Sequence, residues 1–336
     1  MALPKAKAEV TQQYMDVLPE DPGTGWLARA RNAARARWSE AGLPVRRDEY
    51  WRYTDPRGYT DVDPAFASSS AATDLFAGID AVTLTFVDGV FDPAQSDDLD
   101  LAGARLDLLS QAGAVDIHWA QDLLGHLETN GQAPVARPLA ALTTQMASEG
   151  VLIHVTGNAA KPLRLRYVSG GGQPSMQQVV KLDPGASLTI LEEGLPGARS
   201  SVTLEADVAK GAALNHIRVQ GPEREQQAMT HLFARIGEES QFKSFTLTGH
   251  GTLTRNEAIL DIVGDNAVAH VAGAALGEGT FHHDDTVFVT HDAVGCESRQ
   301  VFKKVLRDGA VGVFQGKILV KEGAQKTDGY QISQSL

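Results

Sequence analysis

The 336-residue sequence predicts a mainly β protein. A parallel β-helix (solenoid) over residues 150–336 follows a mostly helical α/β region over residues 1–149. Two observations support this fold class. From Gly150 onward, short β-branched or alternating runs such as VLIHVTG, SVTLEADV and TVFVTH are punctuated by glycines, and helical periodicity almost vanishes. In addition, the turn glycines of this part recur at a nearly constant step.

The glycine repeat favours a solenoid over other β folds. Glycines followed by small or polar residues recur at steps of 28, 26, 26 and 27 residues, at Gly157, Gly185, Gly211, Gly237 and Gly264. A meander sandwich has turn signals every ~8–12 residues and gives no reason for a longer period. In a solenoid each coil stacks on the last, which produces such a period. We expect glycine at corners with positive φ, and Val, Ile and Leu in the interior.

Residues 24–41 predict a helix, because tryptophans and alanines recur there at three- and four-residue steps. Gly42 and Pro44 follow as stop signals. Arg29 and its neighbouring arginines lie largely off the apolar stripe. We interpret them as a solvated face rather than a nucleic-acid site, since an acidic stretch lies beside them.

The rest of the first region is mixed. Residues 82–87 predict a strand, followed by a turn at Asp88–Gly89. Helical spacing of leucines predicts helices within 105–130 and 137–148, and residues 68–73 form a short Ser/Ala linker.

The net charge of −12 comes from one stretch. Residues 61–130 contain 13 acidic residues and a single basic one. We interpret this stretch as a solvated connection, with steering of a basic partner or attraction of iron as the alternative. It disfavours a nucleic-acid partner, because phosphate contacts need Lys and Arg. Residues 267–277, the most apolar run, are too few to cross a membrane, and the polar N-terminus does not resemble a signal peptide. We therefore expect a cytoplasmic protein.

Motifs for nucleotide or nucleophile chemistry are missing, and we assign no catalytic residue. Gly316 and Lys317 are followed by Ile318, where a phosphate-binding loop needs Ser or Thr. Cys296 is the single cysteine, which excludes an intrachain disulfide and a four-thiolate metal site. Low aromatic content, 6%, disfavours a polysaccharide-acting β-helix enzyme.

The richest polar cluster is late in the chain. A metal-dependent enzyme on a β-helix or β-barrel, using His282, His283, Asp284 and His291, is the alternative function, because imidazole and carboxylate are usual metal ligands. Against it, adjacent His282 and His283 on a strand point to opposite faces. His291 and Cys296 remain candidate metal ligands, although a small buried cysteine is the simpler interpretation.

Two stretches resemble one known family. Residues 42–54, GLPVRRDEYWRYT, resemble the G-x-P-x-(R/K)-x-x-E-x-W-(R/K)-Y-T motif of SufD proteins, and residues 291–300 resemble their H-x4-C-x-S-R-Q segment. Residues 313–329 resemble the F-x-G-x-I…A-x-K-T-D-G run, which the sister subunit SufB shares in weaker form. The matching residues include Glu49, Trp51, Arg52, Tyr53, Thr54, Ser298, Gln300, Gly316, Lys326, Thr327, Asp328 and Gly329.

The resemblance implies a non-catalytic subunit of the SUF scaffold for iron–sulfur cluster assembly. Members of this family have a right-handed parallel β-helix between helical domains. They pair with SufB through the β-helices and bind the SufC ATPase through a C-terminal domain. A homodimer is a further possibility. The resemblance implies no cofactor bound by this chain alone, only a transient iron–sulfur cluster in the complex.

The sequence departs from the family after the K-T-D-G run. Members continue into a stretch with a D-V-x-C-x-H-G motif and then into SufC-docking helices, whereas this sequence stops at Leu336. We expect the family's cluster-contacting Cys and His to be absent and SufC docking to be lost or weakened. Their role does not transfer to Cys296 and His291, which match a different segment.

Overall fold

The computed structural model describes residues 3–63, 74–221 and 225–336. Its N-terminal part contains the helices α1 (Lys5–Val17), α2 (Trp26–Ala41) and α3 (Arg57–Thr60) and the 3₁₀ turn η1 (Glu49–Trp51). The helix predicted over 24–41 is confirmed as α2. It ends at Ala41. Gly42 donates the last helical N–H to the carbonyl oxygen of Trp38 at 2.9 Å and then turns the chain out of the helix with a φ of 71°. The linker expected over 68–73 lies outside the described residues.

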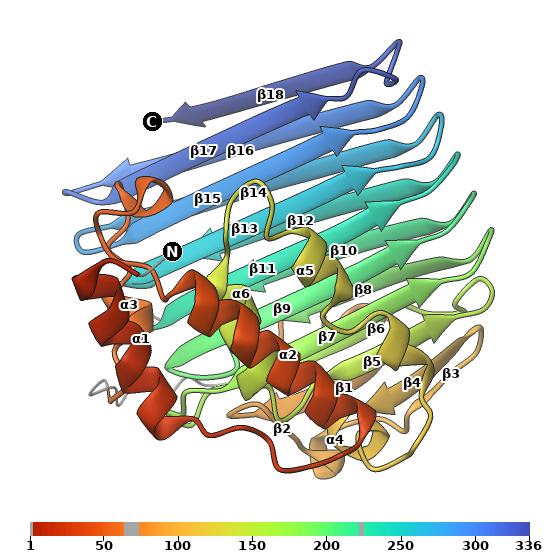
Figure 1. The fold of residues 1–336 in the computed structure, drawn as a ribbon. Helices are drawn as coiled ribbons and strands as arrows, with labels where there is room; N and C mark the ends of the chain where they lie inside the picture. Colours follow the sequence, from red (N-terminus) through yellow and green to blue (C-terminus); the bar gives the residue numbers. More distant parts are fainter. Residues whose placement is uncertain (1–2, 64–73, 222–224) are drawn as a thin grey trace.

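Two facing sheets, each of nine strands in the described residues, form a β-solenoid of about six turns (Figure 1). Sheet A contains, in spatial order, β2 (Val90–Phe91), β1 (Val82–Val87), β6 (Leu163–Val168), β8 (Ser187–Glu193), β10 (Ala213–Gln220), β12 (Gln241–Gly249), β14 (Val268–Glu278), β16 (Glu297–Arg307) and β18 (Asp328–Ser335). Sheet B contains β3 (Asp100–Leu101), β4 (Ala104–Leu108), β5 (Val151–Val155), β7 (Ser175–Leu182), β9 (Arg199–Val208), β11 (Gln227–Ile236), β13 (Leu253–Ile262), β15 (His282–His291) and β17 (Val311–Val320).

From β5 onward the chain alternates between the sheets, and each strand pairs in parallel with the strand one coil later. The predicted fold class is therefore confirmed. The predicted strand at 82–87 is β1. The turn at Asp88–Gly89, with φ values of 47° and 77°, joins it to β2 as a hairpin.

The turns that lead into the strands of sheet A explain the repeat of about 26–28 residues. They also correct the expectation that every repeat glycine has a positive φ. Two positions before each strand of sheet A from β8 onward stands a left-handed residue, and these are Gly185, Gly211, Glu239, Asn266, Gly295 and Lys326. Positive φ was expected at all five repeat glycines, but only Gly185 and Gly211 have it, and Gly157, Gly237 and Gly264 do not. Gly264 is required for another reason. A Cβ there would lie 1.9 Å from the backbone nitrogen of Glu238 in the preceding coil.

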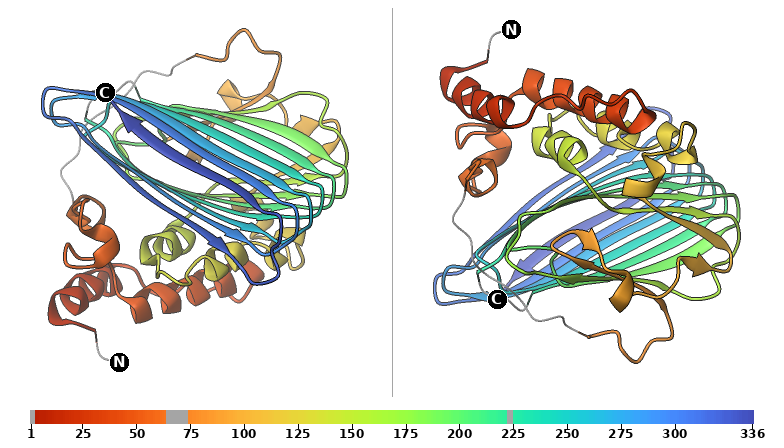
Figure 2. Two further views of the ribbon diagram at one scale, coloured as in Figure 1. Left: turned by 90° about the horizontal axis from the view of Figure 1, so that it is seen from above. Right: turned by 90° about the horizontal axis from the view of Figure 1, so that it is seen from below.

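Helices cover the outer face of sheet B, and Figure 2 shows them gathered on one side of the solenoid. The remaining elements are α4 (Leu109–Ala112), α5 (His126–Asn130), α6 (Pro138–Met146), η2 (Pro93–Gln95) and η3 (Trp119–Asp122). Trp38 and Trp51 pack with Leu139 of α6 and Met229 of β11 in one buried cluster. The helical layer is thus held to the sheet by apolar contact.

Two expectations for the first region need adjustment. The helix predicted within 105–130 is wrong at its start, because residues 104–108 form β4. There Leu106 and Leu108 alternate with polar residues and enter the solenoid core. The helix predicted over 137–148 is confirmed as α6. Both sheets begin before residue 150, since β1 pairs with β6 and β4 with β5.

Among the described residues, no helix combines the length and the apolar character that crossing a membrane needs.

Candidate functional site

Two of the sequence features meet on the outer face of sheet B. Thr54, which ends the W-R-Y-T stretch, donates a hydrogen bond to Oδ2 of Asp284 at 2.5 Å, and its Oγ1 lies 3.1 Å from Nε2 of His282. Trp51 lies against Arg255 of β13, with 4.3 Å between the guanidinium carbon and the ring centre. Segments 230 residues apart therefore form one junction.

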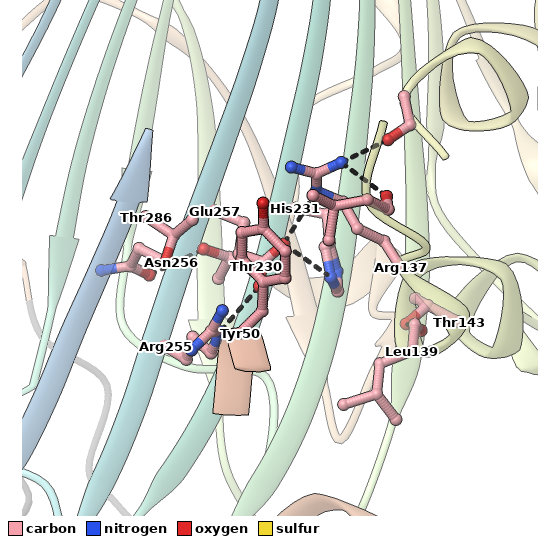
Figure 3. Close-up of polar contacts among 12 residues, drawn as sticks. Tyr50, Arg137, Leu139, Thr143, Thr230, His231, Arg255, Asn256, Glu257 and Thr286 are labelled. Atoms are coloured by element: carbon pink, nitrogen blue, oxygen red, sulfur yellow. Dashed lines mark hydrogen bonds and ion pairs between the residues drawn. The ribbon is translucent and has the colours of Figure 1, made fainter. Parts of the chain in front are cut away.

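Buried charges hold this junction, which we define as Trp51, Thr54, Arg137, Arg255, Glu257 and Asp284. Arg255 donates to Glu257 at 2.7 Å and to Asp284 at 2.5 Å. Arg137 donates to Glu257 at 3.1 Å (Figure 3). The four charged side chains are between 0 and 5% exposed, and two cations balance two anions. The charges of the junction are thus balanced and buried.

The pKa values at the junction follow from its charges and burial. Burial alone would raise the pKa of Glu257, but Arg255, His231 and Arg137 outweigh it and lower the pKa to about 2. Burial lowers the pKa of His231 to about 4, so its imidazole is neutral. Arg255 and Arg137 therefore bind an ionised Glu257 carboxylate. The junction in this way holds the N-terminal segment to sheet B.

The cluster His282, His283, Asp284 and His291 is not formed as one site. His282 and Asp284 lie on the outer face of β15, where Thr54 contacts both. His283 points into the solenoid, where its Nε2 lies 3.1 Å from Oγ1 of Thr248. Residues one apart on a strand face opposite sides, as expected from the sequence. The metal-dependent enzyme that needs these four residues together is thus not supported.

His291 and Cys296 lie near the corner between β15 and β16. Nε2 of the buried His291 is 2.8 Å from Oγ of Ser298. The thiol of Cys296 donates to the carbonyl oxygen of Gly264 at 3.2 Å, and burial raises its pKa, which keeps it protonated. Throughout the described ranges, no three His, Cys, Asp or Glu side chains are grouped so as to hold a metal ion.

The K-T-D-G run forms the corner between β17 and β18. Lys326 is left-handed, with a φ of 58°, and Thr327 donates to the carbonyl oxygen of Ala324 at 3.0 Å. Asp328 pairs with Arg299 at 2.8 Å. Of the other motif residues, Gly329 follows in β18, Gly316 stands in β17 where a Cβ would meet the side chain of Gln331, and Ser298 and Gln300 are buried on β16. The run therefore specifies a turn.

Sequence reasoning missed the polar residues inside the solenoid. In β10, His216, Arg218 and Gln220 share the inward face with Leu214, although an apolar interior was expected. Arg218 donates to the buried Glu192 at 2.6 Å. Lys304 lies 3.0 Å from Asp285 in a later coil. The alternating pattern ALNHIRVQ carried the signal, because these residues recur at steps of two.

Comparison with known sequences places the chain in a family. A family model described as "SUF system FeS cluster assembly, SufBD core domain" matches residues 167–336. The chain therefore belongs to the SufBD core family of the SUF iron–sulfur cluster assembly system. It is also similar to "Iron-sulfur cluster assembly protein SufD" of Escherichia coli (strain K12). The identity is 26% over an alignment of 311 residues, and the match covers 88% of this chain and 70% of the relative. The chain is thus SufD-like.

Acid should weaken the fold through its buried histidines. His231 and His283 have pKa values lowered to about 4 by burial, whereas unfolded histidine titrates near ~6.5. The unfolded chain therefore gains protons first. The stabilisation present above pH ~6.5 is lost as pH falls towards 4, by on the order of 2–3 kcal/mol per histidine.

Urea unfolding at pH 7.5 and pH 5 measures this loss. We expect His283→Gln to flatten the dependence on pH and the exposed His126→Gln to leave it unchanged. An equal slope in all three proteins would contradict the assignment.

Proposed function

We propose that the chain acts in the cytoplasm as a non-catalytic scaffold subunit of a SUF-type complex for iron–sulfur cluster assembly. In this proposal it pairs with a SufB-type subunit through the solenoid and works with a SufC-type ATPase. The observation that carries the proposal is that the family match, residues 167–336, coincides with the coils from β6 to β18. A stack of parallel coils offers a long and stiff surface for a partner.

The polar chemistry of the chain supports a scaffold role. At the junction, Arg255 and Arg137 occupy the carboxylate of Glu257, and Thr54 and Arg255 bind Asp284. These groups position segments of the chain. A catalytic site instead needs groups free to meet a substrate.

The iron–sulfur cluster is cargo of the complex in this proposal, and the chain alone holds none. Cys296 supports this, because its buried thiol is hydrogen-bonded to Gly264 and its pKa is raised. A cluster needs thiolate ligands, which this environment disfavours.

Co-expression tests the pairing. The tagged chain is produced with the SufB-type subunit, the SufC-type subunit, or both, from the same genome, and each mixture passes through gel filtration at 150 mM salt. We expect the SufB-type subunit to co-elute in a defined ratio. Light scattering on the chain alone measures any homodimer. Retention of neither partner would contradict the proposal.

Cys296→Ser tests the location of the cargo. We expect the reconstituted complex to assemble the same amount of cluster, within about twofold, because the buried thiol does not reach a partner surface. Iron and sulfide analysis of the purified complex measures this, and ATP hydrolysis serves as the control for assembly. A lost cluster with intact assembly would place the cargo on this chain.

A further inference from the structure

A groove of about 470 Å³ lies between α2 and residues 121–130, away from the junction. Its volume is within the ~300–1,000 Å³ of ligand-binding clefts. Its α2 side presents Trp26, Arg29, Ala30, Ala33 and Arg37. The residues of the other side are Gln121, Asp122, Leu124, Gly125, His126, Thr129 and Asn130.

The opposite wall of the groove is firmly held. Glu205 of β9, which is fully buried, accepts the backbone N–H groups of Gly125 and Glu128 at 2.6 and 2.7 Å. Arg37 donates in turn to the buried carboxylate of Glu128, which ties α2 to the same segment. The groove is therefore formed before any ligand arrives, and less ordering is needed on binding.

The arginines of α2 differ in how their charge is used. Arg31 pairs with Asp21 at 3.0 Å, and Arg35 donates to the carbonyl oxygen of Leu18. Arg29 is exposed, and within the described part of the chain its side chain donates to the carbonyl oxygen of Thr24 and meets no carboxylate. Arg37 is paired with Glu128, but 22% of its side chain stays exposed at the groove. On the solvated face expected from the sequence, Arg29 and the exposed part of Arg37 thus offer positive charge to the groove.

The spacing of these arginines defines what they can bind. Arg29 and Arg37 are eight residues apart, which is about 12 Å along a helix. Four residues of extended chain span about 13 Å. Ala30 and Ala33 stand between the arginines, so a backbone can approach α2 closely.

Charge complementarity selects the kind of ligand. Arg29 and Arg37 attract carboxylates, and His126 adds a further N–H donor. Asp122 and the surrounding acidic stretch repel every anion, but the repulsion grows with the ligand's charge, so a segment with two carboxylates is favoured over a polyanion such as nucleic acid. We propose that the groove binds an extended segment of a partner protein that carries two carboxylates three to four residues apart. This inference goes beyond the proposed function and does not depend on it.

A labelled peptide tests the groove on the full chain. The probe is a fluorescein-labelled peptide with two glutamates four positions apart and small residues between them, and a second peptide has the glutamates adjacent. We expect saturable binding of the first peptide below about 1 mM and binding of the second that is weaker by about fivefold or more.

Three variants locate the binding. Arg29→Glu should weaken it by about tenfold or more through loss of a charge-assisted hydrogen bond. Ala33→Tyr, at an exposed position, should do the same by filling the groove. Arg307→Glu makes the same charge change on β16 and should alter binding by less than about twofold. Thermal unfolding checks that each variant is folded.

The inference is overturned if the first peptide shows no saturable binding to the folded wild-type chain. It is also overturned if Arg29→Glu and Ala33→Tyr bind as well as the wild type, or if both peptides bind equally. Tighter binding of a duplex oligonucleotide that Ala33→Tyr abolishes would replace the peptide by a nucleic acid.

Discussion

Gly264→Ala should lower the free energy of unfolding by roughly 3 kcal/mol or more, or prevent folding altogether. A Cβ at this corner would lie 1.9 Å from the backbone nitrogen of Glu238 and 2.2 Å from the carbonyl carbon of Gly237. These are backbone atoms of the preceding coil, so they cannot move aside as a flexible side chain does. The two coils would have to separate and lose the parallel pairing between β12 and β14. Urea unfolding of the purified variant measures the loss.

Gly157→Ala is the matched control. Gly157 belongs to the same repeat, its φ lies outside the left-handed range, and a Cβ there meets no atom within 4 Å. Alanine should therefore be neutral or raise stability by about 0.4–1 kcal/mol, because it restricts the unfolded chain. If both variants lost the same stability, close coil stacking would not be the reason for glycine at 264.

Glu257→Leu should cost about 3–5 kcal/mol and release the N-terminal segment from the sheet. The substitution leaves Arg255 and Arg137 buried without their shared carboxylate. Arg255 also contacts Trp51, so its rearrangement should disturb the segment that begins at η1. Hydrogen exchange over residues 49–60 should accelerate along with the loss of stability measured in urea.

Arg235→Met gives the comparison for an exposed pair. Arg235 donates to Asp207 at 2.7 Å, but its side chain is 53% exposed, so water and salt screen the pair. Its removal should cost less than about 1 kcal/mol.

Replacing the four charged residues of the junction together by apolar ones should recover much of the stability lost in Glu257→Leu, because no buried charge is then left unpaired. If Glu257 were fully exposed to solvent, or if Glu257→Leu cost no stability, the junction would not hold the N-terminal segment to the sheet.

Much of the fold could be predicted because its signals are local or periodic. The stripe of α2, the strand β1 and the coil step depend on neighbouring residues or on a constant spacing, which a single sequence displays. The interpretation of 105–108 as helix failed because a short leucine run fits either period. Residues 104–108 form a strand because β4 pairs with β5 in the tertiary structure.

The junction could be predicted only in pieces. The sequence singled out Thr54 and Asp284 separately, and the alternation rule separated His282 from His283 correctly. Nothing in the spacing shows that Thr54 would reach Asp284, because that contact depends on how many coils separate the N-terminal segment from β15. The inward charges of β10 were missed because the alternation reveals only a face. The partner on the neighbouring strand, Glu192 of β8 for Arg218, decides whether a charged residue fits there.

The long separation between Thr54 and Asp284 also sets an order of events during synthesis. The N-terminal helices leave the ribosome first, but the strands that complete their docking surface emerge some 230 residues later. At about 5–20 residues per second, this is a wait of roughly 10 to 50 s. For most of this time Trp51 lacks Arg255, and Trp38 and Trp51 lack Met229, the strand residue of their buried cluster. The nascent chain therefore carries exposed aromatic surface for much of its synthesis, and a general chaperone that binds such surface has its longest opportunity on the first 60 residues.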